Sequence, residues 1–142
     1  MLRKDTRKCY VCGIDNPVGL HVAFEMDSAG RSVRGRFVPR TEHEGWTGIV
    51  HGGIIAALMD EAMVKLAALL GMPAVSAELS VRFRAPAAPG DDLVVTAIVA
   101  REARRLIEAE AKVERGPVVI AEAKGKLLRI ETRGKEGRMV RR

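Results

Sequence analysis

The stretch "GIVHGGIIAALMDEA", residues 48–62, sets two glycines before a long apolar run and then places two carboxylates inside that run. The run continues to about Leu70 without β-alternation and is rich in Ala, Leu and Met, which are good helix formers. The residues "GMP" then end it. Because a helix that is apolar on nearly every side must be surrounded by other structure, this stretch predicts a central helix over residues 53–70.

Alternating stretches on both sides of this helix predict strands. Before it, residues 20–27 ("LHVAFEMD") and 31–39 ("RSVRGRFVP") flank the turn "SAG", which is typical of a hairpin. After it come four more candidates, "AVSAELSVRFR" (74–84), "DLVVTAIVA" (92–100), "RLIEAEAKV" (105–113) and "VVIAEAKGKLL" (118–128). In the first of these four, Val75, Leu79 and Phe83 should face one way and Ser76 the other. The order of elements predicts an α+β fold, an antiparallel sheet wrapped around one long central helix.

The chain of 142 residues fits one domain. We expect that domain to span residues 20–130, between an N-terminal segment at 1–19 and a basic C-terminal tail at 131–142. The net charge of +6 is concentrated at the ends, since residues 1–8 carry +3 and residues 129–142 carry +4. The rest of the chain has no basic excess and few aromatic residues to stack on bases, so nucleic-acid binding is not expected.

No window of the sequence approaches the ~18 uninterrupted apolar residues that mark a membrane span. The basic N-terminus is not followed by the apolar stretch of a signal peptide. We therefore expect a cytoplasmic protein that does not bind membranes.

Cys9 and Cys12 form a C-x-x-C pair in "CYVCG". A zinc ion on these thiols would need further ligands, from His21, His43 or a second subunit. A thioredoxin-type redox pair would open a helix after a strand, whereas only a charged segment precedes this pair. We therefore expect a structural turn, with no bound metal and no cofactor of the protein's own.

Gly52 and Gly53 lie at the predicted N-terminus of the helix. The free N–H groups and the positive end of the helix dipole there favour partial negative charge on a ligand. Because glycine has no side chain, a substrate oxygen can approach these amides, which would supply half of an oxyanion site. A simpler interpretation, in which the glycines only allow a tight turn into the helix, stays open at this point.

Asp60 has apolar neighbours such as Ala56 and Val64. A carboxylate in such surroundings is costly unless it is paired or shifted toward its neutral form, and a general base benefits from the second arrangement. A structural explanation stays open as well, in which Asp60 lies at an exposed seam or accepts hydrogen bonds from backbone groups. Glu61 has an ordinary explanation, because Lys65 lies four residues on and could pair with it at the surface.

Gly52 and Asp60 are eight residues apart, which is about 12 Å along a helix. A base must lie within hydrogen-bond reach of the reacting atoms, directly or through one water, so these two residues of one chain cannot serve the same site. If both act together, a second subunit must bring its helix alongside in the antiparallel direction. The spacing therefore favours a homodimer with two composite sites.

The motif "VHGGIIAALMDEA" (50–62) resembles the signature of hotdog-fold acyl-CoA thioesterases of the phenylacetic-acid-degradation type. The segment "CYVCGIDNPVGLH" (9–21) resembles the N-terminal part of many bacterial and archaeal members, and "VSAELSVRFRAPAAPGD" (75–91) follows the helix as in that family. The resemblance covers the chain from about Cys9 to Ile130. It implies a hotdog fold, hydrolysis of an acyl-CoA thioester with CoA as part of the substrate, and a homodimer or a dimer of dimers, a homotetramer.

The resemblance also implies roles for particular residues. Gly52 would donate its backbone N–H to the thioester carbonyl, and His51 would lie beside that carbonyl. Asp60 of the other subunit would be the general base that activates water, or the nucleophile. Ser76 matches a position that helps to place the water in some members.

Residues assigned to substrate or CoA binding are Gly53, Glu61, Trp46 and Arg84, with Arg84 falling where some relatives contact CoA and Trp46 beside the acyl group. The chain departs from the family at Gly45, where several relatives place Asn or Gln six residues before the histidine. Neighbouring Glu44 stands where similar sequences often have Gln. This departure concerns how the thioester is positioned. The sequence does not distinguish an aryl from an aliphatic acyl group.

Two other functions fit the sequence less well. Hotdog enoyl-CoA hydratases carry a Gly-Asp-x-Asn-Pro-x-His motif that "GIDNPVGLH" (13–21) resembles only superficially, since its spacing is wrong and it precedes the first strand. A non-catalytic acyl-CoA sensor would usually carry a DNA-binding segment, and about 20 residues before the first strand do not make a helix-turn-helix. Asp60 in the helix favours catalysis over sensing.

Overall fold

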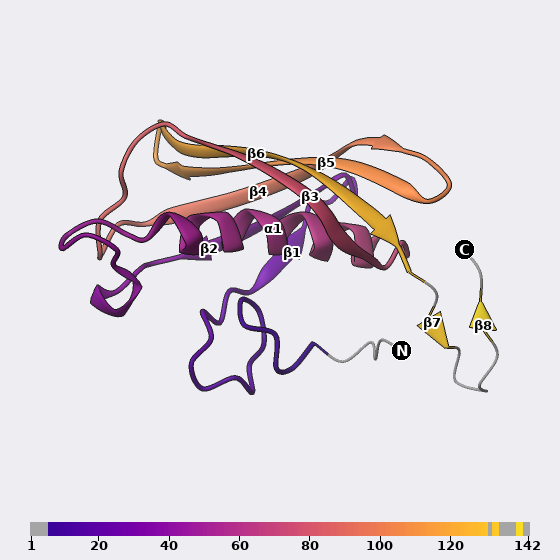
Figure 1. Ribbon diagram of the computed structural model, residues 1–142, viewed down its shortest axis with the longest axis horizontal. Coiled ribbons are helices and arrows are strands. Elements are labelled where there is room, and N and C mark those ends of the chain that lie inside the picture. Colours follow the sequence, from indigo (N-terminus) through magenta and orange to yellow (C-terminus); the bar gives the residue numbers. More distant parts are fainter. Residues whose placement is uncertain (1–5, 131, 134–138, 141–142) are drawn as a thin grey trace.

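The computed structural model describes residues 6–130, 132–133 and 139–140, so the outermost parts of both predicted basic ends lie outside the described residues. A six-stranded antiparallel sheet covers one long helix, α1, as Figure 1 shows. The elements in chain order are β1 (Phe24–Met26), β2 (Ser32–Phe37), a 3-10 helix η1 (Thr41–His43), α1 (Gly52–Leu69), β3 (Ala74–Phe83), β4 (Leu93–Glu102), β5 (Leu106–Arg115), β6 (Val118–Arg129), β7 (Thr132–Arg133) and β8 (Met139–Val140).

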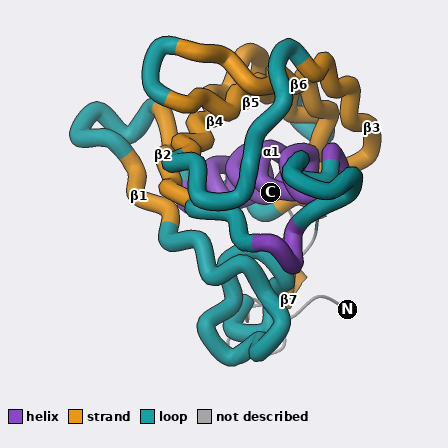
Figure 2. Tube along the Cα trace, turned by 90° about the vertical axis from the view of Figure 1, so that its left-hand side faces the viewer, coloured by secondary structure: helices purple, strands orange, loops and turns teal. Residues whose placement is uncertain are grey.

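The strand order in the sheet is β1-β2-β4-β5-β6-β3, so β1 and β3 form its two edges. Figures 1 and 2 both show α1 under the curved sheet, with the N-terminal segment, residues 6–23, on the other side of the helix. This is the predicted α+β architecture of the hotdog fold, and the prediction is confirmed. The short pair β7 and β8 forms a separate two-stranded sheet.

The core lies between α1 and the inner face of the sheet. Side chains of α1 that are fully buried include Leu58, Met59, Met63 and Leu66. They pack with inward-facing strand residues, among them Val33, Leu93, Val95, Ile107, Val113 and Leu127. At Gly125 of β6, an added Cβ would lie 2.9 Å from the Met63 sulfur, so the end of the Met63 side chain occupies the space that a side chain at position 125 would take.

The first predicted strand is shorter than its alternating sequence. Leu20 and Val22 are buried as expected, but the strand begins only at Phe24. The Val22 N–H donates to the Val11 carbonyl at 2.9 Å. The residues just before β1 therefore pair with the chain around Val11 rather than with β2. Val11 itself belongs to the core cluster. The predicted domain boundaries at 19/20 and 130/131 stay a prediction.

The predicted alternation of β3 is wrong at its start. Ser76 pairs with Leu127 of β6, Glu78 pairs with Lys126, and Ala77 between them is an extra residue, a β-bulge. Directly opposed residues point to the same side of a sheet and a bulge shifts the alternation by one. Ser76 therefore shares the inner, helix-side face with Leu79 and Phe83, whereas simple alternation had placed it outside.

Among the described residues, no helix is long and apolar enough to span a membrane.

The burial of α1 predicts unequal effects for two identical substitutions on it. Leu58→Ala removes a side chain that is fully buried, and it should lower the free energy of unfolding by about 2–5 kcal/mol because a cavity forms in the core. Leu69→Ala removes one that is 47% exposed and should cost well under half as much. Urea unfolding of both variants measures the difference. Equal losses would contradict this placement of the helix.

Candidate active site

His51 caps the N-terminus of α1. Its Nδ1 atom accepts a hydrogen bond from the Gly53 N–H at 2.8 Å, which satisfies one of the free donors of the first turn. A neutral imidazole that accepts at Nδ1 carries its proton on Nε2. An added Cβ at Gly53 would lie 2.9 Å from Nδ1, so this cap requires a glycine. His51 itself is exposed, and its Nε2 can donate to a ligand.

The Gly52 N–H stays available at this helix start. The Gly53 N–H bonds to the His51 ring and the Ile54 and Ile55 N–H groups bond to the His51 carbonyl. Within the described part of the chain, no acceptor pairs with the Gly52 N–H. A donor at the positive end of a helix dipole binds a partly negative oxygen well.

Two pockets meet at Gly52. A pocket of about 330 Å³ is lined by Gly45, Trp46, Ile49, Val50, His51 and Gly52. A pocket of about 360 Å³ is lined by Ile49, Val50 and Gly52 together with Ile55, Phe83, Arg84, Ala85, Pro86, Ala87 and Ile120. A group bound at the Gly52 N–H can therefore extend in two directions.

Phe83 covers Gly52 from the end of β3. An added Cβ at Gly52 would lie 3.2 Å from the tip of the Phe83 ring, so glycine allows the ring to approach the helix start. Phe83 remains 57% exposed. From the sequence alone, Phe83 is predicted only to lie in a strand. An aromatic residue at the end of an alternating stretch, just before "RAP", was the available signal.

The loop before α1 is held by backbone hydrogen bonds from two directions. The Val50 N–H donates to the Ala87 carbonyl at 2.8 Å, and the His51 N–H donates to the His43 carbonyl at 2.8 Å. Gly45 donates its N–H to the Ile49 carbonyl at 2.9 Å. The helix start is therefore positioned by the loop after β3 as much as by its own turn.

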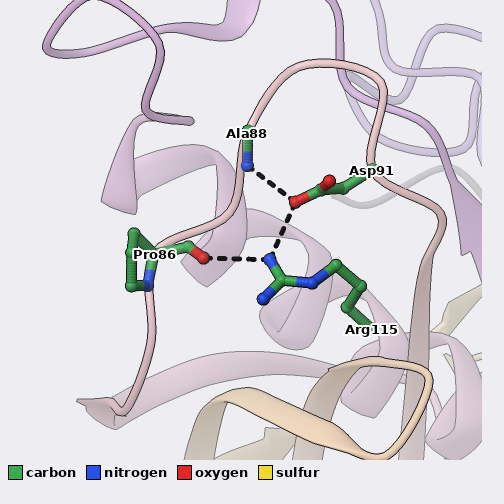
Figure 3. Close-up of polar contacts among 4 residues, drawn as sticks. All are labelled: Pro86, Ala88, Asp91 and Arg115. Carbon is green, nitrogen blue, oxygen red and sulfur yellow. Dashed lines mark hydrogen bonds and ion pairs between the residues drawn. The ribbon is translucent and has the colours of Figure 1, made fainter.

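Asp91 braces the loop after β3, as Figure 3 shows. Its Oδ2 accepts from the Ala88 N–H and from Arg115 Nη1, both at 2.8 Å, and the same Nη1 donates to the Pro86 carbonyl at 3.1 Å. The Ala88 N–H and the Arg115 guanidinium hold the pKa of Asp91 below its usual value. This network fixes the wall of the larger pocket.

Asp60 of α1 and Ser76 of β3 are hydrogen-bonded to each other. The Ser76 hydroxyl donates a short hydrogen bond to Asp60 Oδ1. The structure therefore brings together two residues that the resemblance assigned to one task. Asp60 is half-buried rather than enclosed in the core, because it faces the helix side of edge strand β3. In a single chain, Asp60 therefore lies at a partly exposed seam between α1 and β3.

Gly52 and Asp60 lie in the same helix, at its first and ninth residues. The rise of ~1.5 Å per residue separates them by about 12 Å. The pockets at Gly52 are lined by neither Asp60 nor Ser76. Within one chain, Gly52 and Asp60 therefore lie in separate places.

Glu61 points to the N-terminal segment. Its Oε1 accepts from the Cys12 thiol at 3.2 Å, and the Lys65 ammonium lies 3.8 Å from the same sulfur. The predicted pairing of Glu61 with Lys65 is wrong, because Cys12 lies between them. Burial, followed by the bond to Glu61 and its charge, raises the pKa of the Cys12 thiol to about 12.

Arg84 lines the larger of the two pockets and Trp46 lines the smaller one. Arg84 pairs with Glu122 at 3.1 Å and both side chains are about half exposed, so this pair is easily opened. Trp46 is 85% exposed. An indole with so little cover is available to contact a ligand or a second chain.

Residues 47–121 match the thioesterase superfamily, and the chain belongs to this family. Acyl-coenzyme A thioesterase 13 from Homo sapiens is 36% identical over 67 residues, and the match covers 46% of this chain and 48% of the human protein. The chain thus spans about half the length of the curated relatives it matches.

Solved structures agree with the fold. A crystal structure described as a thioesterase superfamily protein has a TM-score of 0.80 and 28% identity, covering 86% of this chain and 60% of the other. The PaaI protein of the E. coli phenylacetic acid degradation operon has a TM-score of 0.72 and 21% identity, covering 78% and 80% of the two chains. A hypothetical thioesterase with coenzyme A from Streptococcus pneumoniae has a TM-score of 0.73 and 15% identity, covering 80% and 88%.

His43 supports the loop that holds the helix start. It is buried, its Nδ1 accepts from the Arg40 N–H at 2.9 Å, and its ring packs against Phe37. Burial lowers the pKa of His43 below its ordinary value, and Arg40 lowers it further. A histidine kept neutral by the fold contributes stability above its unfolded pKa of about 6.5, and that stability is lost as the pH falls through the folded pKa.

His43→Asn should therefore flatten the pH dependence of stability. Asn keeps an acceptor for the Arg40 N–H but does not titrate. Between about pH 7.5 and about pH 5, the free energy of unfolding should fall less in the variant than in the native chain. Urea unfolding at several pH values measures this. His21→Asn, at an exposed position, is the matched control, and a His43 variant with the native slope would refute the assignment.

Proposed function

We propose that the protein hydrolyses acyl-CoA thioesters to a free acid and CoA. The observation that carries this proposal is the unpaired Gly52 N–H at the start of α1, where two pockets meet. Membership of the thioesterase superfamily and the name of the human relative support it. CoA is part of the substrate, and we expect the reaction to need no metal or redox cofactor, because a carboxylate can activate the water and an N–H group can polarise the carbonyl.

Gly52 and His51 form the electrophilic half of the site. The thioester oxygen accepts a hydrogen bond from the Gly52 N–H, and the helix dipole favours the negative charge that grows on this oxygen. The Nε2–H of His51 lies beside the carbonyl. Gly53 contributes by accommodating the His51 cap, which keeps the ring in place.

Asp60 of a second copy forms the basic half. It takes a proton from water while the water oxygen attacks the thioester carbon. The tetrahedral intermediate then collapses, the C–S bond breaks, and the CoA sulfur leaves with a proton. Ser76 occupies one carboxylate oxygen of Asp60, which orients the other toward the water. Direct attack by Asp60 on the thioester is the alternative within the same geometry.

A homodimer along β3 supplies both halves. β3 is an edge strand, and its side chains Leu79 and Phe83 are 36% and 57% exposed although they face the helix side. An exposed edge with apolar side chains favours pairing with another chain. Antiparallel pairing of two β3 strands would place two α1 helices side by side in opposite directions. Further association into a dimer of dimers and a cytoplasmic location stay predictions.

CoA and the acyl group fill the two pockets in this proposal. Arg84 lies at the larger pocket and would contact the phosphates of CoA, with Trp46 beside the acyl group in the smaller pocket. Glu61, also assigned to substrate binding from sequence, bonds to Cys12 and plays no part in the proposed reaction.

Asp60→Asn should lower kcat for thioester hydrolysis by about 10²–10⁴, the contribution of a positioned general base. The measurement is release of free thiol from a panel of aliphatic and aryl CoA thioesters. The dimer should persist in sedimentation, because Asn keeps the shape and an acceptor for Ser76. Glu61→Gln is the matched control and should change kcat far less. Equal losses in the two variants would remove Asp60 from the mechanism.

Gly52→Pro should remove the proposed oxyanion donor while preserving the helix. Proline is accepted at the first helical position, and His51 has the extended backbone (φ −57°, ψ 132°) that precedes proline. Gly52→Ala is the control, since it adds a similar contact with Phe83 but keeps the N–H. The proline variant should lose about 10²–10³ in kcat relative to the alanine variant.

Mixing the Gly52→Pro and Asp60→Asn chains tests the composite site. In a mixed dimer one site has both defects and the other has neither, so activity should return to about a quarter of the native value after random exchange. No recovery in dimers shown to have exchanged would refute the shared site. Binding of CoA thioesters without thiol release by the native chain would instead favour a sensor, and hydration of enoyl-CoA would favour a hydratase.

A further inference from the structure

Two thiols and a carboxylate lie together beside α1, away from the helix start. The Sγ atoms of Cys9 and Cys12 and a carboxylate oxygen of Glu61 all lie within 4.8 Å of one another. All three residues are partly buried. The group joins the N-terminal segment to the middle of the helix, and the proposed thioesterase mechanism does not use it.

A tight backbone turn brings the two cysteines together and orients the Cys9 sulfur. The Cys12 N–H lies 3.5 Å from Cys9 Sγ, and the Gly13 N–H donates to the Cys9 carbonyl at 2.9 Å. An added Cβ at Gly13 would come within 2.5 Å of the Arg7 and Cys9 backbone atoms, so the tight turn requires glycine. The Cys12 N–H orients the Cys9 sulfur, as outer hydrogen bonds orient metal ligands, and the Gly13 bond holds the turn itself.

The separations fit a tetrahedral metal ion. With Zn–S near 2.3 Å and Zn–O near 2.0 Å, tetrahedral ligands lie about 3.8 Å apart for two sulfurs and about 3.5 Å apart for sulfur and oxygen. The Cys12 sulfur and the Glu61 oxygen are 3.2 Å apart, and no pair in the group exceeds 4.8 Å. Shifts of less than about 1 Å would complete the geometry. Two thiolates in the C-x-x-C spacing select zinc and similar ions over magnesium and calcium.

Lys65 supplies the charge that such a centre requires. Two thiolates and one carboxylate around a divalent ion leave one net negative charge. The Lys65 ammonium lies 3.8 Å from the Cys12 sulfur, one helical turn beyond Glu61. A partly buried charge is favourable only when it is paired, and Lys65 provides the partner.

We propose that Cys9, Cys12 and Glu61 bind one divalent transition-metal ion, with Zn²⁺ as the first choice, and that this ion fixes the N-terminal segment to α1. Binding releases the two thiol protons to solvent, the carboxylate enters already ionised, and water takes the fourth position. The proposal departs from the expectation of a metal-free turn. Neither His21 nor His43 belongs to the group, and the third ligand comes from the helix instead of from a histidine.

Titration of the full chain with Co²⁺, under reducing and chelator-cleared conditions, tests the site. The chain has two cysteines, so a thiolate-to-cobalt absorption band must come from this pair. We expect one ion per chain, displacement of Co²⁺ by Zn²⁺, and a higher thermal unfolding midpoint with Zn²⁺ present.

Variants separate the ligands from the fold. Cys12→Ser keeps a hydroxyl donor for Glu61 but removes a thiolate, and Glu61→Gln removes the carboxylate. Each should weaken Zn²⁺ binding by at least about tenfold. Asp15→Asn, an exposed carboxylate of the same segment, should bind like the native chain. Circular dichroism and the midpoint without metal establish that each variant is folded.

Three results would overturn the proposal. They are the absence of a thiolate band in the native chain, native affinity in Glu61→Gln, or one ion per two chains, which would mean that thiols from two copies share the metal. None of these readouts depends on thioester hydrolysis, so failure here leaves the proposed activity untouched, and the reverse also holds.

Discussion

Enclosure of α1 by the curved sheet is the constraint on which the rest of the structure depends. The helix buries Leu58, Met59, Met63 and Leu66 completely, and Gly125 of the sheet leaves space for the end of the Met63 side chain. Because the helix is packed this tightly, its position and its rotation about its own axis are set by the sheet. Its N-terminus meets the two pockets. The two carboxylates that interrupt its apolar surface lie on different sides of it, Asp60 at edge strand β3 and Glu61 at the N-terminal segment.

Asp60 and Glu61 are adjacent in sequence but belong to different parts of the molecule. Asp60 faces edge strand β3 and bonds to Ser76, whereas Glu61 faces the N-terminal segment and bonds to Cys12. Successive residues of a helix point about 100° apart. The pair of carboxylates is therefore two independent features, and their roles in the proposals differ accordingly.

Much of the fold could be predicted because it follows from local periodicity. The helix begins at Gly52, one residue from the predicted start, and the four strands after it lie where the alternation placed them. The glycines and His51 could be placed at the helix start for the same reason. Contacts between distant segments could not be predicted this way. Glu61 and Cys12 are 49 residues apart, and the helical spacing alone favoured Lys65. The β-bulge at Ala77 leaves no signature in the alternation of apolar residues, so Ser76 was assigned to the wrong face.

The bulge at Ala77 determines on which face of β3 the Ser76 hydroxyl lies. Ser76 reaches Asp60 because one additional residue, Ala77, turns the strand by a half period before Leu79 and Phe83 resume the inner face. In a relative of this chain, the face on which such a serine lies depends on the number of residues in the strand as well as on the serine itself. A homologue with the same serine but without the extra residue would carry its hydroxyl on the solvent side, and an alignment that closes the gap would conceal the difference.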